Sequence, residues 1–330
     1  MVDDQRRDGV DITVAPIIFR VTADDDGCRL DKYLALQLPE HSRSRLATWI
    51  QDGQVQVNDR DARPKTRVTE NDQVCVTPPK PRAHTLAPQE IDLETVYHDE
   101  HIIVVDKTPN LVVHPGAGNP DGTVINGLIH QFGPLSSIGL PSRPGVVHRI
   151  DKGTSGLLVF ARTDAAHTHL AKQFSDHCVE RRYRALVWDH GLRDEGTIET
   201  PAYGRHPRDR RKFTAALSTG KRAVTHWRVL ERIHPCTWVE LSLETGRTHQ
   251  IRVHMSEAGQ PLVGDPMYGR RRRVEKQTRL RQLGFEFGLT RQALHAATLG
   301  FVHPATGEMV RFESHIASDI QSVLDILRDG

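Results

Sequence analysis

The chain carries one carboxylate, Asp151, in a setting that could hold a reacting group in place. His148 and Arg149 stand just before it, and the sequence Lys-Gly-Thr-Ser-Gly follows it at positions 152–156. The two glycines permit a tight turn, and the apolar run Leu157–Ala161 predicts a buried strand directly afterwards. Most aspartates in loops only accept hydrogen bonds from their own turn. An aspartate on a turn anchored to a core strand is held as rigidly as catalysis requires.

Three short patterns suggest a kinase loop, a dinucleotide-binding loop and a metal site, but each pattern lacks residues that such a site needs. The sequence His-Arg-Ile-Asp at 148–151 differs from a kinase catalytic loop, because its aspartate does not directly follow the arginine and no matching asparagine comes after it. The glycines of 116–122 begin like a dinucleotide-binding loop, but the third comes one place late and a proline intervenes. The 19 histidines include no His-Glu-x-x-His, and His249 and His254 do not share a helix face well. We therefore expect no metal site.

The net charge is only +2, but the basic residues are clustered. One cluster contains the single acidic residue Asp209 among Arg205, Arg208, Arg210, Arg211, Lys212, Lys221 and Arg222. A second cluster contains Glu275 among Arg270, Arg271, Arg272, Arg273, Lys276, Arg279 and Arg281. One basic run is often no more than a solvated face of a protein. Two of them favour a phosphate-binding surface, with Arg208, Arg210 and Arg211 as candidate RNA contacts.

Length and composition indicate an ordinary globular protein of two domains. The chain has 330 residues, of which 37% are hydrophobic and 26% charged, and no apolar run is long enough for a membrane span. The first residues are polar and lack the apolar core of a secretory signal. The four cysteines are scattered without a close pair, which is typical neither of a disulfide framework nor of a zinc ribbon. We therefore expect a cytoplasmic protein without a membrane partner.

The N-terminal quarter predicts a small α/β unit at residues 18–77, after a disordered tail at 1–17. Helical spacing covers Arg29–Leu36 and Ser42–Ile50, with Ser42 as a candidate N-cap, and the alternation of Gln54–Asn58 predicts a strand. Such a unit could simply dock on its neighbour. It also resembles the S4-type RNA-binding domain, in which a basic helix face contacts RNA phosphates. The candidate RNA contacts are then Arg43, Arg45, Lys65 and Arg67.

A proline-spaced linker is predicted at residues 78–90, and a larger domain at 91–330. Short strands dominate this domain, at Ile102–Val105, Leu157–Ala161, Tyr183–Val187, Ala223–Leu230 and Trp238–Leu243. Helices are predicted at Ala165–His177, capped by Asp164, and at Ile316–Leu327. This mixture indicates an α+β fold with a large, mostly antiparallel sheet.

Six segments, in the same order along the chain, resemble the RluA-type pseudouridine synthases. The segment Val146–Thr163 is similar to the family's catalytic motif, His-Arg-Leu-Asp followed by Thr-Ser-Gly, with Ile150 in place of the leucine. The other five are Leu111–His130, Glu180–Val187, Leu243–Met255, Pro261–Gly269 and Gln292–Glu308. The resemblance covers nearly the whole chain from about Arg20. It is strongest to the D-type synthases of large-subunit ribosomal RNA, which carry an extra N-terminal RNA-binding domain.

This resemblance implies a pseudouridine synthase catalytic domain preceded by an S4-like domain. The expected reaction is the isomerisation of specific uridines in 23S ribosomal RNA of the pre-ribosomal large subunit, in the helix 69 stem-loop. The glycosidic bond of uracil breaks, the base turns over, and its C5 rejoins the same ribose carbon. This reaction requires no redox carrier, metal or energy source, so no cofactor is expected. The protein is expected to be a monomer.

The resemblance also assigns roles to individual residues. Asp151 is the catalytic carboxylate, acting either as a nucleophile on the sugar carbon or as the base that removes the 2′-proton. Arg247 is expected to pair with Asp151 and to fix its orientation. Tyr183 is expected to stack on the target base, and His148 and Arg149 are candidate substrate-binding residues.

Two other functions use the same features. A non-catalytic RNA-binding assembly factor could use the same basic surface, but it has no need for Asp151, Tyr183 and Arg247 together. A glycosidase would generally use two carboxylates about 5–9 Å apart, whereas the matched motifs supply only one.

Overall fold

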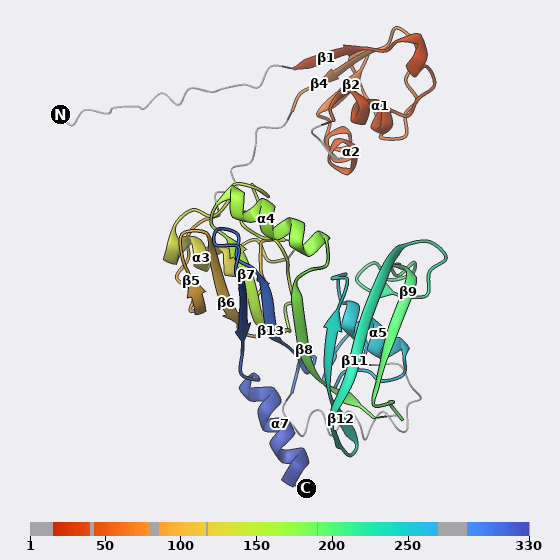
Figure 1. Ribbon diagram of the computed structural model, residues 1–330. Helices are drawn as coiled ribbons and strands as arrows, with labels where there is room; N and C mark the ends of the chain where they lie inside the picture. The colour runs from red at the N-terminus through yellow and green to blue at the C-terminus, as the bar shows by residue number, and fades with distance from the viewer. Residues whose placement is uncertain are drawn as a thin grey trace, which may run out of the picture. The chain divides into compact units, whose positions relative to one another are not determined.

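The computed structural model describes residues 16–39, 43–78, 86–116, 118–189, 191–269 and 289–329, with only the backbone at 44 and 45. The chain divides into two compact units, residues 1–83 and 84–330 (Figure 1). Most of the predicted tail and linker lies outside the described residues, and Ile17, assigned to the tail, belongs to the first strand. Within the described ranges, no helix is long and apolar enough to cross a membrane.

The smaller unit packs two helices against a four-stranded antiparallel sheet. Leu30 and Leu34 share one helix face because they are one turn apart, and both are fully buried in its core. The predicted helices and strand are confirmed, although the proposed cap Ser42 lies outside the described residues. The elements are β1 (Ile17–Arg20), a 3-10 turn (Ala23–Asp25), α1 (Leu30–Gln37), α2 (Arg43–Gln51), β2 (Val55–Val57), β3 (Arg60–Asp61) and β4 (Gln73–Val76).

The larger unit is built on one ten-stranded sheet. Its strands are β5 (Glu94–His98), β6 (Ile102–Lys107), β7 (Ser155–Ala161), β8 (Glu180–Trp188), β9 (Glu195–Arg205), β10 (Phe213–Thr214), β11 (Lys221–Ile233), β12 (Cys236–Leu243), β13 (Leu294–Val302) and β14 (Met309–Glu313). Their order is β10-β9-β11-β12-β8-β13-β7-β6-β5, and β14 pairs with β13. Neighbouring strands are antiparallel except β13 and β7. The predicted α+β class with a mostly antiparallel sheet is confirmed.

Strand β7 is buried along its whole length because both faces of the sheet are covered there. Leu158 and Phe160 belong to a core shared with α3 (Val124–Phe132) and α5 (Gln250–Glu257). Leu157 and Val159 alternate onto the opposite face, where they share a core with α4 (Asp164–Ser175) (Figure 1). The turn that carries Asp151 therefore leads into a strand without a single exposed residue.

Helix α4 confirms the predicted helix, but its cap is Thr163 rather than Asp164. The Thr163 hydroxyl accepts a hydrogen bond from the N–H of Ala166 at 3.2 Å. Asp164 instead accepts hydrogen bonds from Ser136 and Ser137, which lower the pKa of its carboxyl group to about 2.

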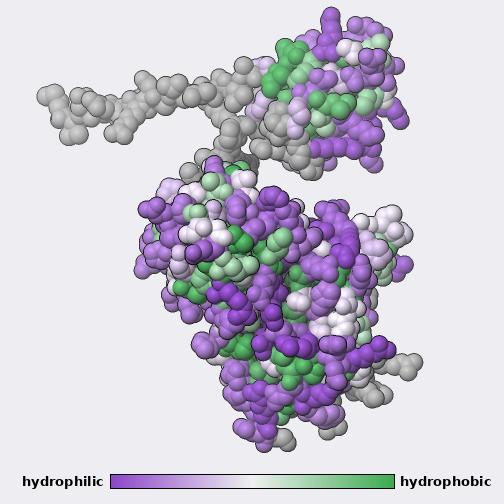
Figure 2. All heavy atoms as spheres, in the orientation of Figure 1, coloured by the Kyte–Doolittle hydropathy of each residue, from purple (hydrophilic) through white to green (hydrophobic). Residues whose placement is uncertain are grey.

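The C-terminal helix is observed as α7 (Ser318–Asp329), close to its predicted range. Its buried Ile320, Val323 and Leu324 contribute to a core that also contains Trp188, the last residue of β8, and Trp238, near the start of β12. On the face shown in Figure 2, hydrophilic residues cover most of the larger unit, and hydrophobic residues form several small patches.

Candidate active site

Asp151 begins a tight turn that ends where β7 starts. The N–H of Thr154 donates to the carbonyl of Asp151 at 3.0 Å. The two glycines of this turn allow close packing on the segment around Gln292. A Cβ at Gly153 would lie 2.8 Å from the Gln292 side chain, and one at Gly156, whose φ is +110°, would lie 2.3 Å from the carbonyl oxygen of Ala296. Glycine is therefore required at Gly156, by close backbone packing and by its conformation, whereas a side chain at Gly153 would have to displace the end of the Gln292 side chain.

Two buried basic side chains hold the backbone of the turn from inside the domain. Lys107 is 1% exposed, and its Nζ donates to the carbonyls of Thr108 and Lys152 at 2.8 and 3.2 Å. Burial lowers the pKa of this lysine to about 7. The Arg291 guanidinium donates to the carbonyl of Gly153 at 2.9 Å and binds the Asp319 carboxylate through two hydrogen bonds of 2.6 Å. Asp151 is thus carried on a rigid support.

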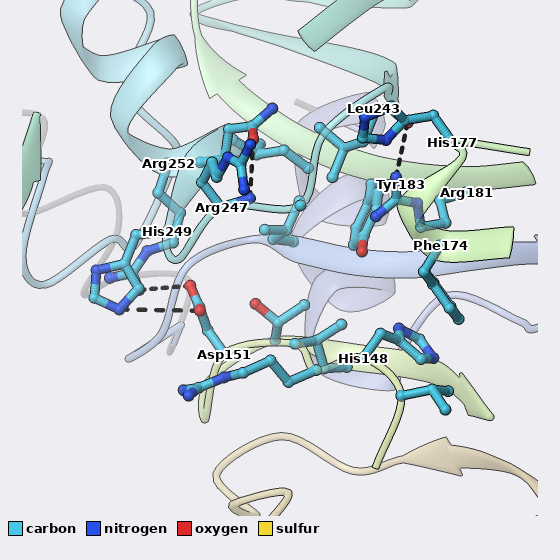
Figure 3. A pocket seen from close by; sticks show the side chains of 18 of the residues that line it. His148, Asp151, Phe174, His177, Arg181, Tyr183, Leu243, Arg247, His249 and Arg252 are labelled. Carbon is cyan, nitrogen blue, oxygen red and sulfur yellow. Dashed lines mark hydrogen bonds and ion pairs between the residues drawn. The ribbon is translucent and has the colours of Figure 1, made fainter. Parts of the chain in front are cut away.

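The guanidinium of Arg252 links Asp151 to a second carboxylate. Its Nη1 donates to Asp151 at 2.9 Å (Figure 3). Its Nε and Nη2 donate to Asp265 at 2.7 and 3.0 Å. Burial works to lower the pKa of Arg252, but the hydrogen bonds and charges of Asp265 and Asp151 raise it well above its usual value. The side chains of Arg252 and Asp265 are 6% and 1% exposed. This arginine orients the Asp151 carboxylate.

The expected pairing of Arg247 with Asp151 is wrong. Arg247 lies in the turn before α5, and its Nε donates to the backbone carbonyl of Arg222 at 3.2 Å. Arg252 lies inside α5, whose buried face is directed toward the catalytic turn, and it takes the place predicted for Arg247. Arg247 still lines the same cavity, which keeps it a candidate for substrate binding.

A cavity of about 570 Å³ opens beside Asp151 on the face of the sheet that α5 covers. Asp151 and Tyr183 both line it, and the hydroxyl end of Tyr183 points into it (Figure 3). Tyr183 is 7% exposed, and burial raises the pKa of its phenol. The structure thus brings the predicted carboxylate and the predicted stacking tyrosine to one cavity, which is also lined by Val147, His148, Arg149, Ile150, Phe174, His177, Arg181, Arg247, His249 and Arg252.

His148 and Arg149 both line the cavity but differ in setting. The His148 ring stacks on Phe174 with 4.5 Å between centroids, and its Nε2 accepts a hydrogen bond from the N–H of Val159 at 3.0 Å. Burial lowers the pKa of His148 to about 3, so this ring is neutral at pH 7. The side chain of Arg149 is exposed. His148 therefore supports the cavity wall, whereas Arg149 is free to contact a substrate.

His249 adds a polar group beside Asp151 that the sequence analysis missed. It immediately precedes α5, its φ is +60°, and its Nε2 lies 3.9 Å from Asp151. Its Nδ1 lies 2.8 Å from the hydroxyl of Tyr268. Burial lowers the pKa of His249, although the Asp151 charge works in the opposite direction.

A second cavity, of about 600 Å³, lies on the other side of Asp151. Arg143, Arg149 and Lys152 line it, together with the Arg252 guanidinium. The Lys152 ammonium donates to Asn119 at 3.2 Å. Asp151 therefore stands between two cavities, and the second has several cations that suit the phosphates of a nucleic acid.

The candidate RNA-contacting residues of the small unit differ in how free they are. Arg43 binds Asp31 at 2.7 Å, and the Arg67 guanidinium donates to the carbonyl of Gly27 at 2.6 Å. Lys65 is exposed. The side chain of Arg45 lies outside the described residues. An RNA contact remains a prediction for all four.

The first basic cluster of the larger unit includes a loop between β9 and β10. Arg208 and Arg210 are exposed, and Arg211 forms an exposed ion pair with Asp209 at 3.2 Å. The second basic cluster, at 270–281, lies outside the described residues. Where the structure is described, no three His, Cys, Asp or Glu side chains are grouped as a metal ion would need.

Comparison with known proteins decides the family. Residues 101–257 match the family described as RNA pseudouridylate synthase, and residues 28–74 match the S4 domain. A ribosomal large subunit pseudouridine synthase D from Pseudomonas aeruginosa is 46% identical over 305 residues, which cover 92% of this chain and 92% of that protein. The chain belongs to the RNA pseudouridine synthase family.

Other similar proteins support the same family. An uncharacterized RNA pseudouridine synthase of Bacillus subtilis is 44% identical over 302 residues, covering 91% of this chain and 94% of that one. Among solved structures, human RNA pseudouridylate synthase domain containing 1 has a TM-score of 0.53 and 26% identity, covering 73% of this chain and 97% of its own. The expected family, catalytic fold and S4 domain are confirmed.

Four residues that support the site were not predicted from the sequence: Arg252, Asp265, Lys107 and Arg291. Arg252 had a usable signal, because it stands between the apolar residues Ile251 and Val253 in the family-like segment Leu243–Met255. A charged residue between apolar residues of a buried helix is itself buried, and a buried charge needs a partner of opposite charge. Lys107 similarly follows the apolar run of β6. Nothing near Arg291 in the sequence indicates that its carboxylate partner lies 28 residues later.

Proposed function

We propose that this synthase isomerises uridines of large-subunit ribosomal RNA with Asp151 as the catalytic carboxylate. The observation that carries the proposal is the Asp151 carboxylate, bound by the buried Arg252 guanidinium at 2.9 Å and facing a cavity that Tyr183 also lines. A rigid carboxylate beside a nucleotide-sized cavity suits a reaction at the ribose of a nucleotide extracted from its stack.

The proposed reaction assigns one task to each group. Asp151 acts at the ribose, either by attacking C1′ or by removing the 2′-proton. Arg252 keeps the carboxylate oriented, and the Tyr183 ring stacks on the uracil and retains it while it turns over. Arg149 and Arg247, which line the cavity, contact the RNA strand around the extracted uridine.

The choice of RNA rests on the relatives. Proteins from Neisseria meningitidis and Zymomonas mobilis that are 46% and 44% identical to this chain are named ribosomal large subunit pseudouridine synthase D. We propose 23S ribosomal RNA as the substrate and its helix 69 stem-loop as the target. The test is to map pseudouridines in ribosomal RNA from cells that lack the protein. Complementation with the native gene, but not with the Asp151→Asn gene, should restore the missing modifications.

The S4-like unit is proposed to bind RNA rather than to catalyse. Removing residues 1–83 should raise KM and make RNA binding less dependent on salt. The slope of the logarithm of the binding constant against the logarithm of the salt concentration should become shallower by about 0.7–0.9 for each phosphate that the protein no longer neutralises. The single-turnover rate at saturating RNA should change much less, because Asp151, Arg252 and Tyr183 all lie in the other unit. A salt titration of both forms, paired with single-turnover assays, measures these effects. An unchanged salt slope with a collapsed rate would place this unit in the active site.

Activity should survive removal of metal ions and need no added nucleotide. The reaction is an isomerisation, so no electron carrier or activated group is consumed. The measurement is the turnover of enzyme dialysed against EDTA on a short stem-loop that folds in monovalent salt. The RNA alone, melted in the same buffer, serves as a control for loss of substrate structure. Activity that is lost on chelation and restored by one particular metal would contradict the prediction.

A further inference from the structure

One buried cation in the cavity is not used by the site described above. Arg181, on β8, is 8% exposed, and its Nη2 donates to the backbone carbonyls of Leu243 and Glu244 at 3.2 and 2.9 Å. Its Nε is buried and has no hydrogen-bond partner among the described residues. No described carboxylate lies within ion-pair distance of the guanidinium, which lies 5.6 Å from the centre of the Phe174 ring. A buried charge without a counter-ion is unfavourable and calls for a specific reason.

The surroundings keep Arg181 in the cavity. A Cβ at Gly246 would lie 2.8 Å from Nη1 of Arg181, so the glycine leaves the space that the guanidinium occupies. Figure 3 shows Arg181 next to Tyr183, on the side of the cavity away from Asp151. The two residues share one face of β8 because they are two positions apart, about 6–7 Å along the strand. A uracil stacked on Tyr183 would therefore reach the guanidinium.

The charges of the cavity wall are unbalanced in the resting enzyme. Asp151, Arg252 and Asp265 form a linked group of two carboxylates and one guanidinium, which carries one net negative charge. Arg181 stands apart from this group with one positive charge of its own. Arg149 and Arg247 also line this cavity, but neither shares a carboxylate with Arg181. The one described carboxylate that lines the cavity, Asp151, is thus already bound by Arg252, and Arg181 is left with an uncompensated charge.

The reaction places a negative charge on the base. When the C1′–N1 bond breaks, its electron pair leaves with the uracil, while C1′ is satisfied by the Asp151 carboxylate or by loss of the 2′-proton. The uracil then carries one negative charge, shared among N1 and its carbonyl oxygens, until C5 bonds to C1′. As C5 bonds to C1′, either the bond from C1′ to Asp151 breaks or the 2′-proton returns from Asp151 to C2′, so the carboxylate is regenerated. The C5 proton is finally lost and N1 gains one, so that the product is an isomer of the substrate.

We propose that Arg181 is a catalytic residue that binds the detached uracil anion and stabilises it while it turns over. The guanidinium is fixed before the reaction begins, so it stabilises the charge that develops on bond breakage without needing to reorganise. A neutral, bound uridine gains much less from it, so the effect falls on the chemical step rather than on binding. This inference rests on the isomerisation of uridine and holds for whichever RNA is the substrate.

The test compares Arg181→Met and Arg181→Lys with a matched control, Arg182→Met. Arg182 is the next residue of the same strand, and its guanidinium is ion-paired with Glu180 at 2.7 Å. We expect Arg181→Met to lower the single-turnover rate at saturating RNA by about 10²–10³-fold, with RNA affinity nearly unchanged. Arg181→Lys should recover part of this loss, and Arg182→Met should leave the rate near that of the native enzyme.

A substrate with a better leaving base separates catalysis from a structural role. Fluorine at C5 stabilises the uracil anion, so the base needs less help to leave the sugar. We therefore expect the rate reduction caused by Arg181→Met to be about tenfold smaller for a 5-fluorouridine substrate, measured as loss of the original nucleoside. The same variant is measured on both substrates, so a general loss of folded protein would reduce both rates equally. If Arg181→Met does not fold, Arg181→Lys is used instead.

Two outcomes would overturn the inference: an equal reduction of rate on both substrates, or an effect confined to RNA affinity. Neither would affect the proposed function, which depends on whether the native enzyme forms pseudouridine on ribosomal RNA. Failure of the native enzyme on that RNA would instead overturn the choice of substrate. The Arg181 test could then be repeated on any RNA that the native enzyme modifies.

Discussion

We expect the Asp151→Asn variant to form no detectable pseudouridine, which corresponds to a loss of about 10⁴-fold or more in rate. The asparagine amide has the size of the carboxylate but can neither attack C1′ nor accept the 2′-proton. Folding should be nearly unchanged, because Arg252 keeps its two hydrogen bonds to Asp265 and the turn keeps its bonds to Lys107 and Arg291. RNA affinity should also stay close to that of the native protein.

The measurement is a multiple-turnover assay with purified Asp151→Asn, accompanied by thermal unfolding and an RNA-binding titration. Asp319→Asn is a useful comparison, because Asp319 supports the turn only through Arg291 and does not line either of the two cavities beside Asp151. Asp319→Asn should keep measurable activity. Repeated turnover by Asp151→Asn would exclude Asp151 as the catalytic carboxylate.

The second large effect is expected at Arg252. Arg252→Met leaves the buried carboxylate of Asp265 without its cation, and Asp151 without the donor that orients it. Removing one member of a buried ion pair costs about 3–5 kcal/mol of stability. We expect a lower melting temperature together with a rate reduced by at least about 10²-fold. Arg252→Lys should recover only part of both, because one ammonium group cannot span the two carboxylates as the planar guanidinium does.

Arg247→Met is the control for Arg252→Met. The same substitution is made in the same motif, but Arg247 does not contact Asp151 and bonds to the carbonyl of Arg222. Its removal should raise KM for RNA with little effect on the single-turnover rate or on stability. Thermal unfolding and single-turnover kinetics on both variants measure the contrast. If Arg247→Met abolished the activity while Arg252→Met kept it, the orienting role of Arg252 would be wrong.

The sequence alone determines the features of this enzyme that depend on neighbouring residues. The apolar run after Asp151 predicts β7, and the turn residues before it predict a rigid loop, because both signals lie within a few positions of each other. The helices of the S4-like unit and α4 follow from helical spacing in the same way. The family motifs are local too, and they identify the family through short segments of fixed spacing. Local sequence signals can misplace the end of a helix by one residue, as they do at the cap of α4, which is Thr163 and not Asp164.

Only the tertiary structure decides which distant residues meet at Asp151. Arg247 and Arg252 stand in one motif, and the face that α5 turns toward the sheet selects Arg252 as the partner. Asp265, Lys107 and Arg291 come from a loop, a strand end and a segment before β13, and they converge because the sheet brings these elements together. The unpaired state of Arg181 is likewise a property of the packed core. Ion pairing depends on distances of a few ångströms in space, which separation along the chain does not specify.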